Sequence, residues 1–536
     1  MGPTPHPPLT HRPWLEWLLV ALAALLVAGA LTVWTNDRDL RGDQQAYDLL
    51  VVRLLDPSVL ARDPLYGREP TQLHVPAFLW LHAAVARRLG GDVEAALAWL
   101  TWPIGALYLI GHYALFRALT GSPAAAALGA VGALTVRNAL GGEFWGFDGM
   151  RSAATRTILA GLVPLLLLLF VGWRRRRGFP LFYLLLGALF NVHPVSAYHL
   201  AQATAVTHVV LARFRPRAIA QVAGGAALFV LAALPYLVPF FLGRDDARDP
   251  ATLALARAAL DHRFGYLFYP IAPNAALSVL FHAALPLVAW LVWRRRAPEH
   301  WRTPLDVVVA AAVVLGLGGT AVIQAVGVWR DRPYLDIQEL RMVRLAYPVL
   351  LGGLALGYAA LLERRTPRAW AGVALLFLAS LVPPHEVIHA FSAEQRATVK
   401  AWLGIGTPPS APAAATAGGA RGATAAWAAA STPSGALFFT DDFDFRIRAR
   451  RAITGSFKDG ALFFLTGTRP FTAWYRLDRE VAACRAVRGR ECWFALARRL
   501  GADYAIVDPG VAQAAPEADF ERVFERDGWS VWRRLS

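Results

Sequence analysis

The sequence predicts a polytopic α-helical membrane protein with a small water-exposed domain at its C-terminal end. Hydrophobic residues fill 56% of its 536 positions and charged residues only 17%, whereas a soluble domain usually carries about 25% charged residues. The mean hydropathy is +0.39, and apolar runs long enough to cross a bilayer recur through the first two thirds of the chain. A disordered chain and an ordinary soluble enzyme are therefore both disfavoured.

About eleven apolar runs are candidates for membrane spans. They are Trp14–Trp34, Ala95–Phe116, Ala124–Val136, Thr155–Trp173, Pro180–Asn191, Ser196–Leu211, Ile219–Leu242, Ala275–Trp293, Pro304–Val328, Val343–Leu362 and Ala369–Val382. The third, fifth and last are short for a hydrocarbon core of about 30 Å. We expect these three to be tilted, broken or extended into their polar flanks.

Arginine clusters between the spans predict the orientation of the bundle. If the N-terminus lies in the cytoplasm, the dense clusters all fall on the cytoplasmic side: Arg117, Arg174–Arg177, Arg213 to Arg217, Arg294–Arg296 with Arg302, and Arg364 to Arg368. Cytoplasmic loops of membrane proteins carry such an excess of basic residues. The net charge of +16 is then mainly a sign of topology, so we expect no nucleic-acid partner.

The chain divides into three predicted parts. Residues 1–382 form the bundle, and its long first external loop, residues 35–94, carries interfacial helices. Residues 383–434 form a hinge and a linker rich in Ala, Gly, Pro and Thr. Residues 435–536 form an external α/β domain. The Arg, Ala and Gly usage is typical of a bacterial genome of high GC content. We therefore expect the bacterial cytoplasmic (inner) membrane, with the C-terminal domain in the periplasm or outside the cell.

The two cysteines, Cys484 and Cys492, both fall in the predicted external domain. A disulfide is compatible with that compartment. Two separate thiols in or near a helical segment are equally compatible with the sequence.

The first external loop is long and not of low complexity. It contains Asp37-Arg38-Asp39 and then Gly42-Asp43-Gln44-x-x-Tyr47, which opens an amphipathic run to Leu55. A second apolar helix, Leu73–Leu89, is interrupted by histidine and arginine and is expected to lie along the membrane surface. Long structured loops in compact proteins are usually functional.

In architecture more than in motif, this chain resembles the C-type (GT-C fold) superfamily of polytopic membrane glycosyltransferases. The resemblance lies in one span, an acidic residue soon after it, two interfacial helices, a multi-span bundle and an external α/β domain. It implies inverting transfer of a sugar from a polyprenyl-phosphate donor to an acceptor at the outer membrane face. It also implies an external carboxylate as general base. The resemblance further implies that a second acidic residue, in the second external loop, assists the base or binds a divalent metal such as Mg or Mn.

These roles are carried onto particular carboxylates. Asp43 is the predicted base, because a carboxylate at the start of the amphipathic helix can face the bundle and take the acceptor's proton; Asp37 and Asp39 are the alternative acidic pair. Asp148 in the second external loop is the second catalytic carboxylate, and Asp43 with Asp148 would be the metal ligands. A plain helix N-cap explains Asp43 equally simply.

Basic residues at the predicted outer ends of spans are candidates for binding the lipid phosphate. They are Arg151, Arg156, His193, Arg341 and Arg344. Each has a simpler explanation: an exposed ion pair with Asp148, a His–Pro turn between two spans, or interfacial snorkelling.

Two other functional classes fit the same bundle. One is a secondary transporter or lipid flippase, and the other is a noncatalytic GT-C-like protein of cell-envelope assembly. The expected partners are the lipid bilayer, a polyprenyl-phosphate sugar and an acceptor that the sequence does not identify.

Overall fold

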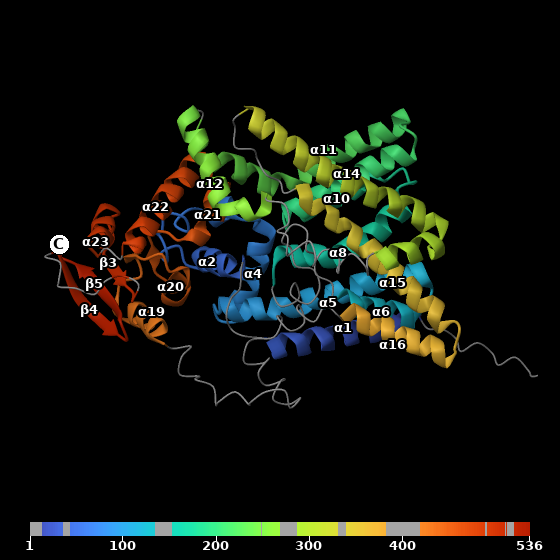
Figure 1. The fold of residues 1–536 in the computed structure, drawn as a ribbon, viewed down its shortest axis with the longest axis horizontal. Coiled ribbons are helices and arrows are strands. Elements are labelled where there is room, and N and C mark those ends of the chain that lie inside the picture. Colours follow the sequence, from blue (N-terminus) through green and yellow to red (C-terminus); the bar gives the residue numbers. More distant parts are fainter. Residues whose placement is uncertain are drawn as a thin grey trace, which may run out of the picture.

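The protein has a helical bundle and a smaller α/β domain that lies against one end of it (Figure 1). The computed structural model describes residues 13–35, 43–134, 153–247, 249–268, 287–330, 339–381, 419–487, 490–509, 511 and 519–535. Within these ranges the first external loop and the bundle are entirely helical apart from turns, and all strands belong to the C-terminal domain.

The bundle consists of helices that follow the predicted spans. They are α1 (Pro13–Thr35), α5 (Val93–Thr120), α6 (Pro123–Ala133), α8 (Thr155–Trp173), α9 (Pro180–Phe190), α10 (Pro194–Leu211), α11 (Pro216–Leu242), a helix over 287–296, α14 (Glu299–Arg330), α15 (Tyr347–Leu362), preceded by the 3₁₀ segment η1 (Glu339–Ala346), and α16 (Pro367–Leu381). Five helices of the described residues are long and apolar enough to cross a membrane. The chain thus has the build of a multi-pass membrane protein.

The spans predicted to be short are short helices. α6 and α9 have 11 residues each, so each is about 16 Å long at 1.5 Å per residue, about half of a hydrocarbon core. α16 has 15 residues. Part of the eighth predicted span, Ala275–Trp293, lies outside the described residues.

Proline and glycine set where the bundle helices begin and how closely they pack. Proline occupies the first turn of α6, α9, α10, α11 and α15, where its missing N–H breaks no helical bond. A Cβ atom on Gly111 of α5 would lie 2.1 Å from the carbonyl oxygen of Gly161 of α8, and one on Gly187 of α9 would lie 2.2 Å from that of Phe229 of α11. Small residues therefore allow the backbones of these pairs to approach closely, as in other membrane bundles.

One end of the bundle contacts the first external loop and the C-terminal domain; we call it the domain-facing end. α8, α10 and α15 all begin there, so the arginine-rich turns that follow them lie at the opposite end. Near that opposite end the Glu16 carboxylate of α1 pairs with the Arg117 guanidinium of α5 at 2.7 Å. The arginine clusters thus gather at one end of the bundle, as the sequence predicts. Which side of a membrane each end occupies stays a prediction.

The first external loop folds into α2 (Asp43–Leu55), α3 (Pro70–Leu73) and α4 (Pro76–Arg88), which lie between the bundle and the C-terminal domain (Figure 1). A further helix, α12 (Pro250–Phe268), packs on the same domain. One apolar core joins these segments, including Leu50 of α2, Leu79 of α4 and Leu260 of α12 together with Phe471 and Trp474 of the C-terminal domain. The loop and the domain therefore bury a common surface.

The C-terminal domain is a mixed five-stranded sheet with helices on both faces. The strands are β1 (Leu437–Phe439), β2 (Ala452–Ile453), β3 (Tyr504–Val507), β4 (Phe520–Arg526) and β5 (Trp529–Arg534), in the order β2-β1-β3-β5-β4. β1 pairs in parallel with β2 and β3, whereas β5 is antiparallel to β3 and β4. The helices are α19 (Ala420–Ser431), α20 (Phe443–Ala449), α21 (Gly460–Thr466), α22 (Thr468–Ala486) and α23 (Arg490–Arg499), and the 3₁₀ turn η2 (Phe457–Asp459) precedes α21.

The folded domain starts earlier than the sequence predicts. α19 lies within residues 383–434, where a hinge and linker are expected, yet Ala425 and Ala428 of this helix are buried against the sheet. Alanine is a strong helix former, and its small side chain lets the helix lie close to strand residues such as Phe438 and Val531. A composition typical of a linker therefore also suits a closely packed helix.

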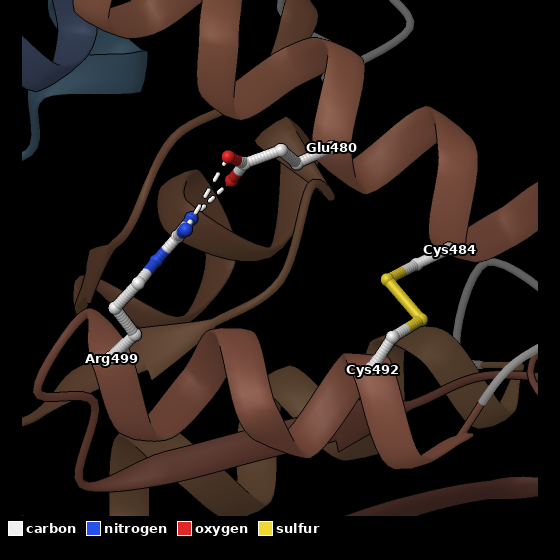
Figure 2. Close-up of a disulfide and its surroundings, with 4 residues drawn as sticks. All are labelled: Glu480, Cys484, Cys492 and Arg499. Atoms are coloured by element: carbon white, nitrogen blue, oxygen red, sulfur yellow. Dashed lines mark hydrogen bonds and ion pairs between the residues drawn. A yellow bond between two sulfur atoms is a disulfide. The ribbon is translucent and has the colours of Figure 1, made fainter.

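The structure pairs the two cysteines. Cys484 near the end of α22 and Cys492 in α23 form a disulfide, with a Cα–Cα distance of 5.9 Å (Figure 2). The Glu480 carboxylate and the Arg499 guanidinium form a second link between the same two helices. Together they fasten α23 to α22.

Candidate functional site

The predicted carboxylates lie largely outside the described part of the molecule. Asp37, Asp39 and Asp148, like Arg151, fall outside the described residues. Asp43 is the first residue of α2, but its side chain is not described. The base role and the metal site therefore stay predictions. Among the described residues, no group of three or more His, Cys, Asp or Glu side chains is arranged to hold a metal ion.

The other predicted basic residues come together at the domain-facing end of the bundle. The Nη2 atom of Arg344 donates to the Ser196 hydroxyl at 2.5 Å, and the same hydroxyl lies 2.7 Å from Nδ1 of His193. The positive charges of Arg156 and Arg341 act on the His193 ring. We call this group the His193 cluster; it consists of Arg156, His193, Ser196, Arg341 and Arg344.

Local sequence explains why helix starts meet there. Pro194 occupies the first turn of α10, so the preceding His193 becomes the N-cap, and its ring accepts a hydrogen bond from the Ser196 backbone N–H. α8 begins at Thr155, after an Ala154 cap that has no side-chain acceptor. The N-terminal ends of helices carry partial positive charge and N–H groups without helical partners. Two such ends thus lie beside the arginines of the cluster.

The electrostatics of the cluster keep the His193 imidazole neutral. His193 occupies the turn between α9 and α10. Burial holds the pKa of His193 well below its usual value, and the nearby charges of Arg156 and Arg341 lower it further. An anion is the kind of ligand that arginine side chains bind well.

α2 lies against this cluster with one of its faces. The Tyr47 hydroxyl of α2 approaches the Thr155 hydroxyl at 3.5 Å, and Thr155 is the neighbour of Arg156 in α8. The Tyr47 ring also stacks on His74 with ring centroids 4.5 Å apart. Asp43 lies one helical turn before Tyr47, and residues so spaced share a helix face. The start of α2 is therefore close to the His193 cluster in the fold.

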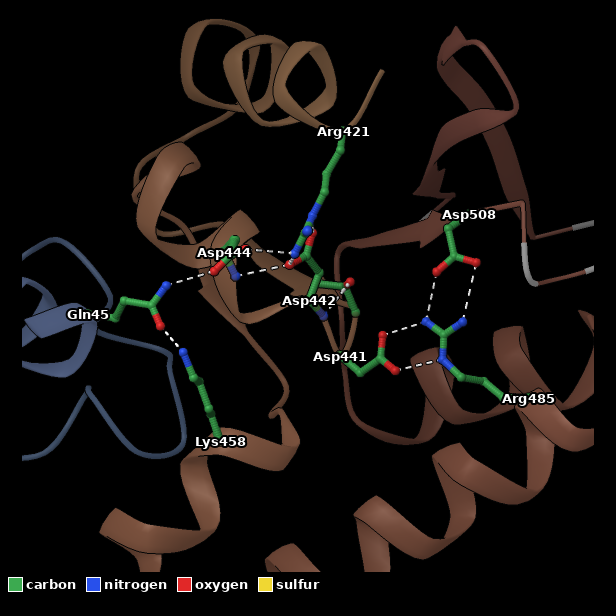
Figure 3. A network of polar contacts seen from close by, with 9 residues as sticks. Gln45, Arg421, Asp441, Asp442, Asp444, Lys458, Arg485 and Asp508 are labelled. Atoms are coloured by element: carbon green, nitrogen blue, oxygen red, sulfur yellow. Dashed lines mark hydrogen bonds and ion pairs between the residues drawn. The ribbon is translucent and has the colours of Figure 1, made fainter. Parts of the chain in front are cut away.

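The next residues of α2 contact the C-terminal domain. Asp48, which is fully buried, pairs with the Arg450 guanidinium. The Gln45 amide donates to the Asp444 carboxylate at 2.9 Å and accepts from Lys458 (Figure 3). Burial raises the pKa of Asp48 to about 6, although Arg450 opposes this rise. α2 is thus held between the bundle and the domain.

A second, fully buried ion network joins the first external loop to the domain. The Arg446 guanidinium of α20 lies 2.8 Å from the Asp63 carboxylate of the loop and 2.7 Å from that of Asp459, and all three side chains are 0% exposed. Asp63 also accepts from the Ile453 backbone N–H at 3.2 Å, and the Arg446 guanidinium lies 4.7 Å from the centre of the Tyr66 ring. We call Asp63, Arg446 and Asp459 the interface triad.

Carboxylates also line the carboxyl ends of the parallel strands. Asp441 follows β1 and Asp508 follows β3, and the Arg485 guanidinium of α22 bridges them at 2.5 and 2.7 Å (Figure 3). Arg421 of α19 pairs with Asp442 beside them. In this arrangement the arginines neutralise the acidic residues and fasten α19 and α22 to the sheet.

No family model matches this chain, and no curated protein sequence matches it. Among solved structures, it is similar to the archaeal oligosaccharyltransferase AglB from Archaeoglobus fulgidus, in complex with an inhibitory peptide and a dolichol-phosphate. The sequence identity is 12% and the TM-score 0.45, over 91% of this chain and 69% of that chain. A likeness this distant assigns no activity to the chain.

Proposed function

We propose that this protein is a membrane glycosyltransferase of the GT-C type, which transfers a sugar from a polyprenyl-phosphate donor to an acceptor at the outer membrane face. The observation that carries the proposal is the His193 cluster, in which Arg156, Arg341 and Arg344 gather with His193 at the domain-facing end. Arginine is well suited to bind phosphate because its planar guanidinium donates several hydrogen bonds at once.

The chemistry follows from the charges that such a reaction develops. As the bond from the sugar to the phosphate breaks, the departing lipid phosphate gains negative charge, and the arginines of the cluster would stabilise it. Asp43, at the start of α2, would take the proton of the acceptor hydroxyl on the opposite side of the sugar, which gives inversion. The contact of Tyr47 with Thr155 supports this placement, because it holds α2 beside the cluster.

A divalent metal forms a further part of the proposal. Asp43 and Asp148 would hold it, and a magnesium or manganese ion there would supply additional positive charge beside the phosphate. We also propose that the domain-facing end is the outer end, so that the C-terminal domain lies in the periplasm or outside a bacterial cell. The arginine-rich turns at the opposite end support this orientation.

The test is sugar transfer by the full-length protein in proteoliposomes. The donors are a panel of polyprenyl-phosphate sugars, a membrane extract supplies acceptors, and release of polyprenyl phosphate is measured. We expect Asp43→Asn to lower the rate about 100-fold or more. Asp56→Asn, which changes an exposed carboxylate of the same loop, should match the wild type.

Two results would count against the proposal in different ways. An Asp43→Asn variant as active as the wild type would remove Asp43 from the base role. A wild-type protein that releases no polyprenyl phosphate from any donor would contradict the glycosyltransferase function itself.

A further inference from the structure

The His193 ring takes part in a directed chain of hydrogen bonds. The Ser196 backbone N–H donates to Nδ1 of His193 at 3.2 Å. The Ser196 hydroxyl lies 2.7 Å from the same nitrogen and accepts from Arg344 at 2.5 Å. Ser196 and Arg344 are both buried, Arg344 to 1% exposure, so water competes little for these bonds.

The chain of bonds determines where the imidazole carries its proton. A backbone N–H can only donate, so Nδ1 must offer a lone pair and cannot hold a proton. Because an arginine can only donate as well, the Ser196 oxygen accepts from Arg344 and its own proton is available to Nδ1. The neutral ring therefore carries its proton on Nε2, and a doubly protonated ring would lose the bond from the Ser196 backbone N–H and reverse the direction of the bond with the Ser196 hydroxyl.

The Nε2 atom is the part of His193 that a ligand can reach. Within the described part of the chain Nε2 makes no hydrogen bond, and the His193 side chain is only half-buried. The charged groups with the largest effect on the ring carry or can carry positive charge: Arg156 of α8, Arg341 of η1, His74 beside α3 and His199 of α10. An anionic acceptor is thus the group that this donor would meet.

We propose that His193 donates a hydrogen bond from Nε2 to a phosphate oxygen of the bound ligand, and that Ser196 and Arg344 are positioning residues that fix this tautomer. The inference rests on the proposed function for the identity of the ligand, a lipid phosphate. No proton is transferred: His193 keeps its proton, and the phosphate accepts it only as a hydrogen bond. The role differs from that of the arginines, because a neutral donor orients the phosphate without adding charge.

A purely structural role makes a different prediction. If His193 only caps α10, then His193→Asn should be harmless, because asparagine is among the best N-cap residues. If Nε2 binds the phosphate, the same substitution keeps the cap and removes the donor. The variant therefore separates the two roles without depending on loss of the fold.

The experiment measures binding of a short-chain polyprenyl phosphate to the full-length protein in detergent, with inorganic phosphate as the headgroup alone. We expect His193→Asn to weaken binding of the lipid phosphate about 10- to 100-fold, the range for a hydrogen bond to a charged group. Ser196→Ala should weaken it by a smaller factor, and Ser196→Thr should restore it. The control is His300→Asn, an exposed histidine of α14 at the opposite end, which should bind like the wild type.

The tautomer has its own readout, which does not require a ligand. Nitrogen NMR of protein labelled at histidine should show His193 as a neutral ring protonated on Nε2 between about pH 5.5 and 8. In Ser196→Ala that preference should weaken. A ring protonated on Nδ1, or doubly protonated at neutral pH, would overturn the inference.

The remaining outcomes separate this inference from the proposed function. If His193→Asn binds normally while Arg156→Gln does not, the histidine role is wrong and the phosphate site stands. If the wild type binds neither probe, both are wrong. If inorganic phosphate binds as tightly as the lipid phosphate, the donor role of His193 stands, but the lipid as its ligand is contradicted.

Discussion

The interface triad and the His193 cluster use arginine in opposite ways. In the triad, Arg446 lies between Asp63 and Asp459, and all three buried side chains have a partner of opposite charge. In the His193 cluster, arginines from α8 and η1 lie near a histidine, and the positive charges of Arg156 and Arg341 act on its ring. Opposite charges can hold two parts of a protein together, whereas arginine side chains are also well suited to bind an anionic ligand.

Helix α2 connects the two regions. α2 contacts the bundle through Tyr47, beside the His193 cluster, and contacts the C-terminal domain through Asp48. The domain therefore helps to fix the helix that begins with Asp43. If the interface is structural, as its charge balance indicates, changes there should alter stability, whereas changes in the cluster should alter ligand binding.

The largest effect on stability is expected from breaking the interface triad. Arg446→Ala would leave two buried carboxylates without their shared cation, which typically costs about 3–5 kcal/mol of unfolding free energy. The unfolding free energy is measured by denaturant titration of the purified protein in detergent, with limited proteolysis of the C-terminal domain as the signal of unfolding. A loss below about 1 kcal/mol would show that the triad does not hold the domain on the loop.

The next effect concerns pH at the other ion pair of the interface. Because the folded protein raises the pKa of Asp48 from 3.8 to about 6, Asp48 binds its proton more tightly when folded. Protonated Asp48 therefore makes its full contribution to the unfolding free energy below about pH 4. This contribution, about 3 kcal/mol, is lost as the pH rises to about 6 and above. Asp48→Asn should remove that part of the pH dependence. Identical pH profiles of variant and wild type would contradict the assignment.

A backbone contact between the bundle and the domain should matter to an intermediate degree. Gly467 has φ +116°, and a Cβ there would lie 2.5 Å from the carbonyl oxygen of Asp245, which follows α11. Gly467→Ala should cost about 1–3 kcal/mol, as for other strained backbone positions. Gly435→Ala is the matched control, since a Cβ there meets nothing within 4 Å. Equal thermal stability of the two variants would show that this junction adapts freely.

The smallest effect is expected from an exposed ion pair at the same junction. The Arg469 and Asp245 side chains are 61% and 51% exposed and lie 2.8 Å apart. Arg469→Ala should change the unfolding free energy by less than about 1 kcal/mol, because water and salt screen such pairs. A loss as large as that of Arg446→Ala would mean that burial does not distinguish these pairs.

The helices of the bundle could be predicted from the sequence because each is a local pattern. Apolar runs, proline at helix starts and the alternation of arginine clusters are all read within a few tens of residues. The same reasoning selected Arg156, His193, Arg341 and Arg344 separately, as charged residues at span ends. That these four gather at one place depends on helix packing, which no local pattern determines.

The interface between the first external loop and the C-terminal domain was not predictable in this way. Asp63 and Arg446 are far apart in the chain, and an aspartate beside a proline looks like any turn residue. α19 was missed for a related reason, because its burial depends on strand residues that are distant in the chain, such as Val531. Asp43, Asp148 and Arg151 keep the roles that the sequence predicts for them, as predictions.

The most direct test of the central claim is the affinity of the purified protein for a polyprenyl phosphate. The variant Arg156→Gln/Arg341→Gln changes two arginines of the His193 cluster, and Arg364→Gln/Arg365→Gln changes two exposed arginines at the opposite end of the bundle. We predict that the first variant binds about 100-fold more weakly than the wild type, while the second binds normally. Equal affinities of all three proteins would contradict the assignment of the cluster as the phosphate site.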